Sequence, residues 1–321
     1  MDKNFWYRLK KPFSVLAPMD GVTDNVFRQI IVETGKPDVL FTEFTNCDGL
    51  LSSGREKVMR RLKFNSDEHL IVAQIWGTDP EAFYKSAKIC VELGFDGIDI
   101  NMGCPVRDVT QRGACSALID TPQLAADIIQ ATKDGAGMLP VSVKTRVGRK
   151  TEIIDRWIRF LLSQNLSALT IHLRTGAEMS KVPAHWEYMP QIVRLRNEIS
   201  AQTVIIGNGD VQDLAEGEDK VKQYQIEGVM YGRAVFNNPW LFNKNIDKNN
   251  VGVKQRLCLF KHHLDLFREE YGESANYAIL KKYCKIYLNS FANAAELREK
   301  IMLTKSLADM ENVTGQLLNS L

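Results

Sequence analysis

The sequence predicts a TIM (β/α)8 barrel followed by a small C-terminal helical domain, an α/β fold. Eight short apolar or β-branched runs alternate with amphipathic stretches, as parallel strands and their covering helices do. Polar side chains also gather at or just beyond the carboxyl ends of the predicted strands, which is the catalytic face of such a barrel. A doubly wound open sheet is the competing fold, and these positions favour the barrel. They are Asp20, Glu43, Gln74, Asn101, Lys144, Arg146, His172, Asn208 and Arg233.

The predicted strands are short and follow one another at regular intervals. In chain order they read FSVLAP, VLFTEF, LIVAQIWG, GIDINMG, PVSVKTRV, ALTIHLRT, TVIIGNG and GVMYGRA, beginning at residues 13, 39, 70, 97, 140, 168, 203 and 228. Between them, DPEAFYKSAKICVELG and TPQLAADIIQATKDG have helix-start residues, an apolar period near 3.6 and a closing glycine. Strand and helix therefore alternate through the predicted barrel.

A change of composition marks the end of the barrel. The segment NKNIDKNNVG, residues 243–252, is polar and Asn-rich without a hydrophobic period, which predicts a linker. The residues after it are rich in helix formers with apolar positions three and four apart. We therefore expect a catalytic barrel domain over residues 1–242 and a helical domain over 253–321.

The composition is that of an ordinary globular protein, with 45% hydrophobic and 25% charged residues. The sequence contains neither a signal-like start nor a long uncharged apolar stretch, so we expect a cytoplasmic protein that does not associate with membranes. The six cysteines are scattered without a CxxC pair, which predicts free thiols; no metal site and no obligate protein partner are predicted.

Any case for nucleic-acid binding must depend on local patches, because the net charge is only +2. One basic patch lies in a single segment, and a second lies at helical spacing near the C-terminus. A solvated surface face is the alternative interpretation of either patch. The first comprises Arg55, Lys57, Arg60, Arg61 and Lys63, and the second Lys281, Lys282 and Lys285.

Cys104 follows the fourth predicted strand, between Gly103 and Pro105. This position places the cysteine on a tight loop over the barrel mouth, where its thiol can face a ligand. The alternative is a buried cysteine that acts as a small hydrophobic residue. The flanking residues favour the functional interpretation.

Two strands end in alternating polar residues that share one side of the strand. Lys144 and Arg146 end the fifth strand, and their charges predict an anionic or electron-rich ligand, with a structural salt bridge to Asp99 or Glu43 as the alternative. His172 and Arg174 end the sixth strand in the same way. A histidine in the core is the alternative for His172.

The last two strands end in GNGD, residues 207–210, and YGRA, residues 231–234. The loops after these strands are the usual phosphate site of a TIM barrel, and glycines let backbone amides approach a phosphate. Arg233 adds a charged donor, although each glycine could serve only a turn. With Lys144 and Gln74, these loops describe a site able to hold a flavin mononucleotide.

Taken together, the motifs resemble the tRNA-dihydrouridine synthase family. APMDGVTD, AQIWG, DINMGCP, VSVKTRVG, IHLRTG, GNGD and YGRA have the family's order and spacing from about residue 13 to residue 242. The resemblance implies substrate contacts at Asn101, Arg146, Arg174, Lys281 and Lys282, and acid catalysis by Cys104. It implies FMN contacts at Pro18, Met19, Asp20, Gln74, Lys144, His172, Asn208, Gly209, Asp210, Gly232 and Arg233.

The family implies an activity as well: reduction of specific uridines in tRNA to 5,6-dihydrouridine, with NADPH as the electron donor. A hydride from reduced FMN would enter C6 of uracil, and Cys104 would donate the proton to C5, because a thiol is mostly protonated at neutral pH. The base would have to leave its stack, so the surrounding RNA would be held by its backbone. An FMN barrel acting on a free small molecule and a non-catalytic RNA-binding protein are the alternatives.

Three departures from the family pattern are visible. The Gly-Ala-Gly-Ala loop reads GACS over residues 113–116, and His-Gly-Arg-Thr reads HLRT over residues 172–175. The basic-basic-histidine helix of the tail reads Lys281, Lys282, Tyr283. No proposed reactive group is lost in any of them.

Overall fold

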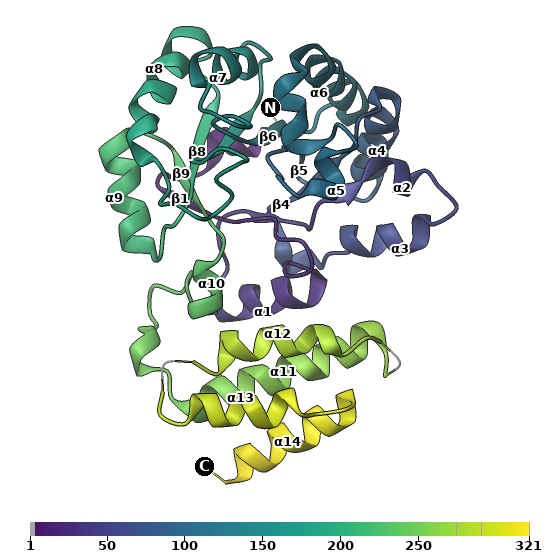
Figure 1. The fold of residues 1–321 in the computed structure, drawn as a ribbon, viewed down its shortest axis with the longest axis vertical. Helices are drawn as coiled ribbons and strands as arrows, with labels where there is room; N and C mark the ends of the chain where they lie inside the picture. The colour runs from purple at the N-terminus through teal and green to yellow at the C-terminus, as the bar shows by residue number, and fades with distance from the viewer. Residues whose placement is uncertain (1–3, 274, 290, 321) are drawn as a thin grey trace.

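The structure is a computed structural model that describes residues 4–273, 275–289 and 291–320. Its centre is a parallel barrel whose strands follow the order β1, β9, β8, β7, β6, β5, β4 and β2, as predicted (Figure 1). A bridge between Val15 and Val39 joins β1 to β2 and closes the barrel. The strands are β1 (Phe13–Leu16), β2 (Leu40–Phe41), β3 (Thr45–Asn46), β4 (Ile71–Trp76), β5 (Gly97–Met102), β6 (Val141–Arg146), β7 (Ala168–His172), β8 (Val204–Asn208) and β9 (Gly228–Tyr231).

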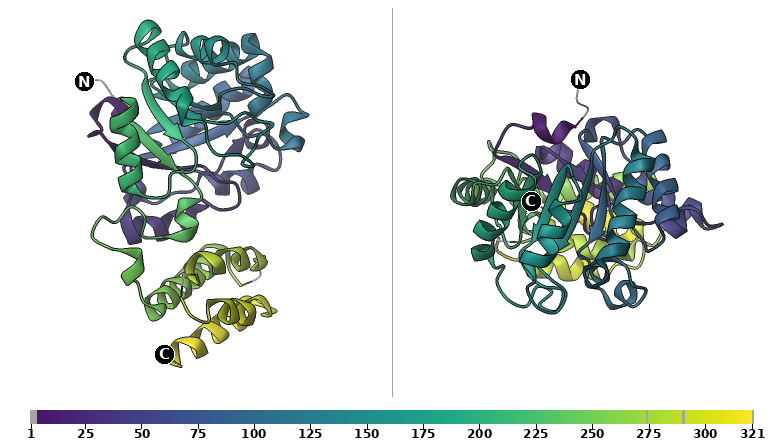
Figure 2. Two further views of the ribbon diagram at one scale, coloured as in Figure 1. Left: turned by 60° about the vertical axis from the view of Figure 1, so that its left-hand side comes forward. Right: turned by 90° about the horizontal axis from the view of Figure 1, so that it is seen from above.

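Helices cover the outside of the barrel and form the C-terminal tail (Figure 2). Around the barrel lie α1 (Asn25–Gly35), α2 (Cys47–Leu50), α3 (Arg55–Met59), α4 (Pro80–Glu92), α5 (Arg107–Thr110), α6 (Pro122–Ala136), α7 (Ile154–Leu162), α8 (Met189–Ile199), α9 (Leu214–Tyr224) and α10 (Ala234–Asn237). The tail consists of α11 (Val253–Tyr271), α12 (Ala278–Tyr287), α13 (Ala294–Met302) and α14 (Leu307–Asn319). The domain boundary at residues 243–252 stays a prediction.

The structure differs from the predicted elements in two places, each for a local reason. The run VLFTEF, residues 39–44, forms a strand only over β2, and β3 begins just after the run. At the end of β2 the Thr42 hydroxyl accepts the Gln74 N–H at 3.1 Å, in place of a backbone carbonyl. The predicted stop at Gly135 is wrong, because α6 continues to Ala136 and ends at Gly137, with φ +59°. A Cβ at Gly135 would lie 2.3 Å from the Tyr84 carbonyl oxygen, so this glycine permits close packing against α4.

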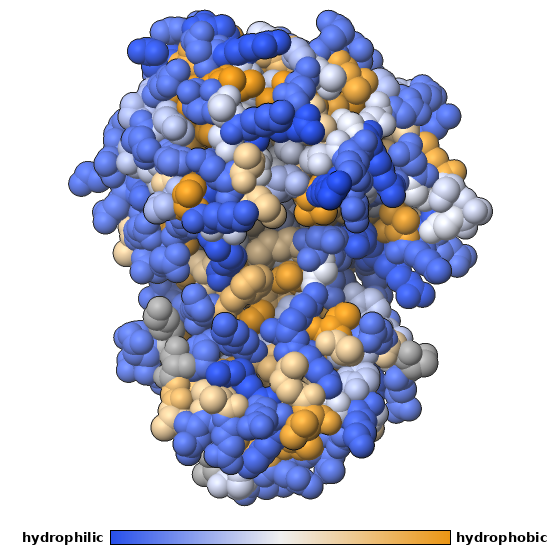
Figure 3. Space-filling view, viewed as in Figure 1, coloured by the Kyte–Doolittle hydropathy of each residue, from blue (hydrophilic) through white to orange (hydrophobic). Residues whose placement is uncertain are grey.

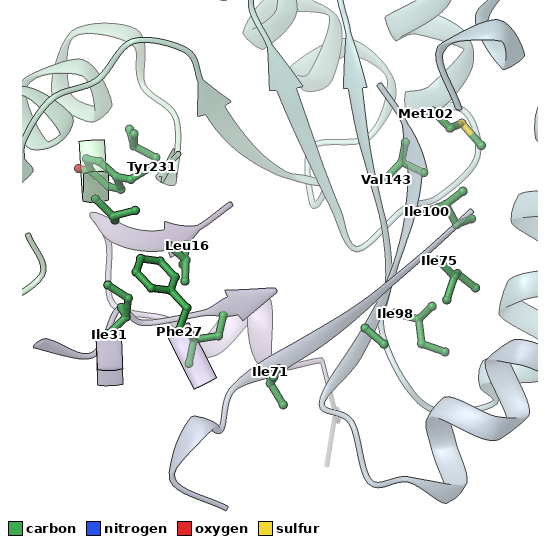
Figure 4. Close-up of a cluster of buried hydrophobic side chains, with 14 of the residues drawn as sticks. Leu16, Phe27, Ile31, Ile71, Ile75, Ile98, Ile100, Met102, Val143 and Tyr231 are labelled. Carbon is green, nitrogen blue, oxygen red and sulfur yellow. The ribbon is translucent and has the colours of Figure 1, made fainter. Parts of the chain in front are cut away.

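Alternation along the strands separates an apolar outer face from the barrel interior. On β5, Ile98 and Ile100 pack toward the helices together with Ile75 and Val143 of the neighbouring strands (Figure 4). Asp99 lies between these two isoleucines and faces the interior, where it accepts hydrogen bonds. The apolar face therefore supports the strands, and the interior positions near their carboxyl ends carry polar groups.

Apolar side chains fill the amino-terminal end of the barrel. The 3₁₀ turn η1 (Phe5–Arg8) places Trp6 against Phe13 and Phe41, with ring centroids 6.0 and 6.4 Å apart. All three side chains are buried. The carboxyl ends of the strands are thus left as the place for a ligand.

The tail packs beneath the barrel against α1 and α10 (Figure 1). The Tyr283 ring lies 5.3 Å from the Phe27 ring and 4.7 Å from the His263 ring, measured between centroids. The Tyr283 hydroxyl donates to the Val22 carbonyl at 2.7 Å. A buried aromatic contact therefore seats α12 on the loop that follows β1. Within the described residues, no helix has both the length and the apolar character needed to cross a membrane.

Candidate active site

A cavity of about 330 Å³ opens at the carboxyl ends of the strands. The ends of β1, β6, β7, β8 and β9 contribute its walls, which is the catalytic face of a TIM barrel. It brings together most of the site residues predicted from the sequence. These are Pro18, Met19, Lys144, Arg146, His172, Arg174, Asn208, Gly209, Asp210, Gly232 and Arg233.

The structure places the remaining predicted residues around this cavity. Asp20 pairs with Arg61 on the loop after β1. Gln74 is fully buried in the barrel interior. Asn101 holds the loop of Cys104, and Cys104 precedes Pro105 and Val106, which are part of the cavity wall. Lys281 and Lys282 lie on α12 in the tail, outside the cavity.

Lys144 gives the cavity an accessible cation. Its Nζ donates to Asn208 Oδ1 at 3.2 Å, and Asn208 donates in turn to the Met230 carbonyl at 2.8 Å. Burial, together with the charge of Arg146, lowers the pKa of Lys144 to about 8. An anionic or electron-rich ligand would stabilise this ammonium group, whose one hydrogen-bond partner among the described residues is the neutral amide of Asn208.

His172 faces the cavity as a neutral imidazole. Burial and then the charges of Arg146 and Lys144 lower its pKa well below the usual value. Its Nε2 lies 3.0 Å from Arg174 Nη1 and must be the acceptor, since a guanidinium only donates. The proton of the neutral ring therefore lies on Nδ1, which can donate to a ligand.

Arg146 and Arg174 mainly hold the loops of the site in place. Arg146 donates to the carbonyls of Gly103, Thr175 and Met179 at 2.8, 2.9 and 3.1 Å, so it joins the Cys104 loop to the loop after β7. Arg174 is 2% exposed and donates to the Val182 carbonyl at 2.7 Å, to His172 and to Asp210. Substrate contact by these two arginines stays a prediction.

The ends of β8 and β9 form the part of the cavity predicted to hold a phosphate. The backbone N–H groups of Gly209, Gly232 and Arg233 have no acceptor within the described parts of the chain. A Cβ at Gly209 would lie 2.6 Å from the Ala184 Cβ, and a φ of +137° also favours glycine there. Unpaired amide donors beside an exposed arginine suit an anion.

Asp210 positions the arginine at this end of the cavity. Its Oδ1 accepts from Arg233 at 2.7 Å, and its Oδ2 accepts from the Ala184 N–H at 2.9 Å and from Arg174. Burial opposes ionisation of Asp210, but the Ala184 hydrogen bond and the two arginines outweigh it and lower the pKa. A carboxylate with these partners fixes Arg233 rather than binding a phosphate itself.

The loop after β5 presents Cys104 in a fixed position. Asn101 Oδ1 accepts the N–H groups of both Gly103 and Cys104 at 3.0 Å, and the Cys104 carbonyl accepts the Ser116 N–H at 3.2 Å. Burial raises the pKa of the Cys104 thiol. It outweighs the hydrogen bond with the Val106 backbone and the charge of Arg146, which both lower this pKa. The thiol is therefore protonated at neutral pH and can donate a proton.

Sequence reasoning missed an ionic cluster on the loop after β1. Arg61 pairs with Asp20 and lies 3.4 Å from Glu43, and Glu43 also accepts the Gly21 N–H. This cluster positions the loop that carries Met19. Asp20 and Glu43 were visible at strand ends, but the sequence offers no signal that links Arg61 to them.

The two lysines of α12 that were predicted to contact RNA donate hydrogen bonds to backbone carbonyls of this protein. Lys281 donates to the carbonyls of Met302, the last residue of α13, and of Thr304, just after it, at 2.8 and 2.7 Å. Lys282 donates to the Gly21 carbonyl. Lys285, which is exposed, has no acceptor or ion-pair partner among the described residues.

Lys285 lines a second cavity, of about 450 Å³, between α10 and α12. Its apolar surface comes from Val22, Phe236 and Ile286, and its cations are Arg233, Lys282 and Lys285. Because Arg233 and Gln212 line both cavities, this one adjoins the first. Figure 3 shows apolar residues where the barrel meets the tail, with hydrophilic residues around them.

The fold and the site together define a TIM-barrel protein whose cavity is lined by cations and glycines and lies beside a loop that carries a protonated thiol. The family model described as Dihydrouridine synthase (Dus) matches residues 15–320. The chain therefore belongs to the dihydrouridine synthase family, as predicted, and is an oxidoreductase.

Individual relatives agree over nearly the whole chain. "Probable tRNA-dihydrouridine synthase 2" of Bacillus subtilis (strain 168) is 48% identical, covering 95% of this chain and 94% of the relative. "Probable tRNA-dihydrouridine synthase" of Staphylococcus aureus (strain Mu50 / ATCC 700699) is 45% identical, covering 96% and 94%. A solved 2-naphthoyl-CoA reductase complex has the same fold, with TM-score 0.59 and 11% identity; the match covers 76% of this chain and 52% of that structure.

Proposed function

We propose that this protein reduces specific uridines in tRNA to 5,6-dihydrouridine, with FMN in the barrel cavity and NADPH as the reductant. The observation that carries the proposal is the juxtaposition of Cys104 with a cationic cavity whose far end offers unpaired amide donors. A tRNA substrate implies a cytoplasmic location.

The residues of the cavity fit FMN. The phosphate would be held by the N–H groups of Gly209 and Gly232 and by Arg233, which Asp210 holds in place. Lys144 and the Nδ1 proton of His172 would serve the electron-rich edge of the ring system. When bound, FMN supplies hydride chemistry.

The protein would supply the proton for C5 of uracil and the contacts that hold the base. Cys104 would donate from Sγ to C5 of uracil, for which a protonated thiol is required. Arg146 would keep the Cys104 loop against the cavity through the Gly103 carbonyl. The NH₂ group of Asn101 has a second hydrogen beyond the one donated to Gln74, and this is the group we assign to contact with the uracil.

The RNA would lie over the cavity between α10 and α12. A uridine in folded RNA must leave its stack to reach a barrel mouth, so the neighbouring nucleotides need a surface of their own. The apolar surface and the three cations of this cavity match a base and its phosphates. Its contact with the first cavity through Arg233 would place those nucleotides next to the target uridine.

The test compares substrates on the purified protein. We expect a flavin absorption spectrum, reduction by NADPH, and reoxidation of the reduced flavin by tRNA but not by free uridine or dihydroorotate. Reoxidation by the free compounds at a comparable rate would favour an enzyme of small molecules, and a colourless protein that does not take up FMN would remove the proposal.

We expect the double variant Lys144→Ala, Arg233→Ala to retain FMN roughly 10² to 10⁴-fold less tightly. Each change removes a charge-assisted hydrogen bond worth about 1.5 to 3 kcal/mol. The measurement is the dissociation constant from titration of flavin fluorescence. Lys150→Ala with Arg156→Ala, two exposed cations outside the cavity, is the matched control and should bind FMN as the parent does.

Lys285→Glu should weaken tRNA binding several-fold and lower the slope of log affinity against log salt by about 1, as expected for one lost phosphate contact. Flavin content should not change. The control is Lys305→Glu, an exposed lysine between α13 and α14 that is outside both cavities. An unchanged affinity would move the RNA surface elsewhere, with Arg55, Lys57 and Arg60 on and after α3 as the next candidates.

The double variant Lys281→Glu, Lys282→Glu is a less direct probe of the same surface. Both lysines bind backbone carbonyls, so their loss should also destabilise the seat of α12. We expect weaker tRNA binding together with a lower melting temperature, whereas Lys285→Glu should leave the melting temperature unchanged.

A further inference from the structure

A series of hydrogen-bonded, buried polar side chains leads to the loop of Cys104. Ser142 Oγ donates to Asp99 Oδ1 at 2.6 Å, and Gln74 Nε2 donates to Asp99 Oδ2 at 2.7 Å. Asn101 Nδ2 then donates to Gln74 Oε1 at 3.0 Å, and Asn101 Oδ1 accepts the Cys104 N–H at 3.0 Å. The first three side chains are at most 1% exposed and Asn101 is 6% exposed.

The direction of every hydrogen bond in this series follows from the carboxylate of Asp99 at one end and from the backbone N–H groups of Gly103 and Cys104 at the other. An ionised carboxylate only accepts hydrogen bonds, so Gln74 must turn its NH₂ group toward Asp99. The Gln74 oxygen then faces Asn101, which must turn its own NH₂ group toward it. The Asn101 oxygen is thereby left for the loop, where a backbone N–H needs an acceptor.

The ionised state of Asp99 is consistent with this arrangement at neutral pH. Burial raises the pKa of Asp99 to about 6. The hydrogen bonds from Ser142 and Gln74 and the charge of Lys144 lower this pKa but do not outweigh burial. The carboxyl group is therefore mostly ionised at neutral pH. If either amide were reversed, an NH₂ group would face another N–H donor in a buried place, which is strongly unfavourable.

We propose that Asp99 is a positioning residue for Cys104, acting through the fixed orientation of Gln74 and Asn101. It touches neither Cys104 nor the cavity. Its effect reaches the loop because each amide can satisfy its neighbours in only one orientation. The same oxygen of Asn101 also accepts the Gly103 N–H at 3.0 Å, so two N–H groups of the loop depend on this orientation.

A rival explanation is that Asp99 acts by its charge on Lys144, whose pKa it raises. Two substitutions separate the explanations. Asp99→Asn removes the charge but can still turn its oxygen to Gln74 and its NH₂ group to the Ser142 hydroxyl, which accepts as well as donates. Asp99→Leu removes both the charge and the acceptor.

The readout is the rate at which iodoacetamide alkylates Cys104, measured by peptide mass spectrometry without tRNA. A Cys258→Ser background removes the exposed cysteine and leaves Cys104 as the one cysteine that is not buried. We expect Asp99→Leu to accelerate alkylation roughly tenfold or more, because two loop hydrogen bonds are lost. Asp99→Asn should accelerate it less than about threefold.

Gln74→Met interrupts the same series of hydrogen bonds while the charge of Asp99 remains. We expect it to accelerate alkylation of Cys104 as much as Asp99→Leu does. This variant decides the question if Asp99→Leu does not fold. Equal acceleration by Asp99→Asn and Asp99→Leu would overturn the proposal in favour of a charge effect. Unchanged alkylation in both Asp99→Leu and Gln74→Met would also overturn it.

The proposal rests on the proposed function in its choice of Cys104 as the group to be positioned. In the catalytic assay, Asp99→Leu should lower the rate at saturating tRNA, with Asp99→Asn restoring most of the rate. Alkylation needs neither substrate nor cofactor. A faster alkylation in a protein without synthase activity would therefore refute the proposed function and uphold the positioning role.

Discussion

Replacing Cys104 with alanine is expected to slow dihydrouridine formation by roughly 10² to 10⁴-fold, the usual contribution of a general acid. The protein should still fold, bind FMN and tRNA, and accept electrons from NADPH, because the change removes a partly buried thiol from a loop that Asn101 holds through backbone N–H groups. The measurement is a single-turnover reoxidation of pre-reduced flavin by tRNA.

Cys115→Ala is the control for this variant. Cys115 lies near Cys104 but is fully buried, so its thiol does not reach the cavity. We expect turnover within a few-fold of the parent. Near-parental turnover in Cys104→Ala, or a larger loss in Cys115→Ala, would assign the proton to another group.

Arg28→Met is expected to lower the free energy of unfolding by about 3 to 5 kcal/mol, because it leaves a buried carboxylate unpaired. Arg28 Nε lies 2.5 Å from Glu68 Oε2 with both side chains fully buried. The arginine also donates to the carbonyls of Thr23 and Lys63 at 2.8 and 2.6 Å. Urea denaturation measures the loss, and a change below about 1 kcal/mol would contradict the prediction.

The double variant Arg28→Met, Glu68→Leu tests the cause. Removing both partners should restore part of the lost stability, since no charge is left buried. If it is no more stable than Arg28→Met alone, the loss comes from packing or from the two carbonyls. The exposed pair of Glu81 and Lys85 on α4 is a reference, with an expected effect of about 0.5 kcal/mol or less.

The fold could be predicted from the sequence because patterns within short segments indicate each strand and each helix of the barrel. Each strand is an apolar run, and each polar strand end points to the same face. The end of β2 at Phe41, inside VLFTEF, could not be predicted, because it depends on the Thr42 hydroxyl meeting a backbone N–H of another strand. Gly135 was misread for a similar reason, since its role depends on the approach of α4.

The site was predicted as a set of residue types but not as a set of contacts. Lys144 and Arg146 look alike in the sequence, yet Lys144 keeps its ammonium in the cavity and Arg146 donates to three backbone carbonyls. Lys281 and Lys285 differ in the same way on α12. Which cation meets a carbonyl is decided by loops distant in sequence, so no local pattern reveals it.

The aromatic contacts of Tyr283 fix the position of α12, and with it the distance between Lys285 and the mouth of the barrel. Tyr283 is 1% exposed between Phe27 and His263, so contact surfaces, rather than the length of chain between them, set the span from Lys285 to the mouth of the barrel. Under the proposed function, an RNA held near Lys285 would present to the barrel mouth only the nucleotide that lies at the matching distance. The choice of uridine would then depend on its distance from the docking surface and would not require recognition of the sequence around it.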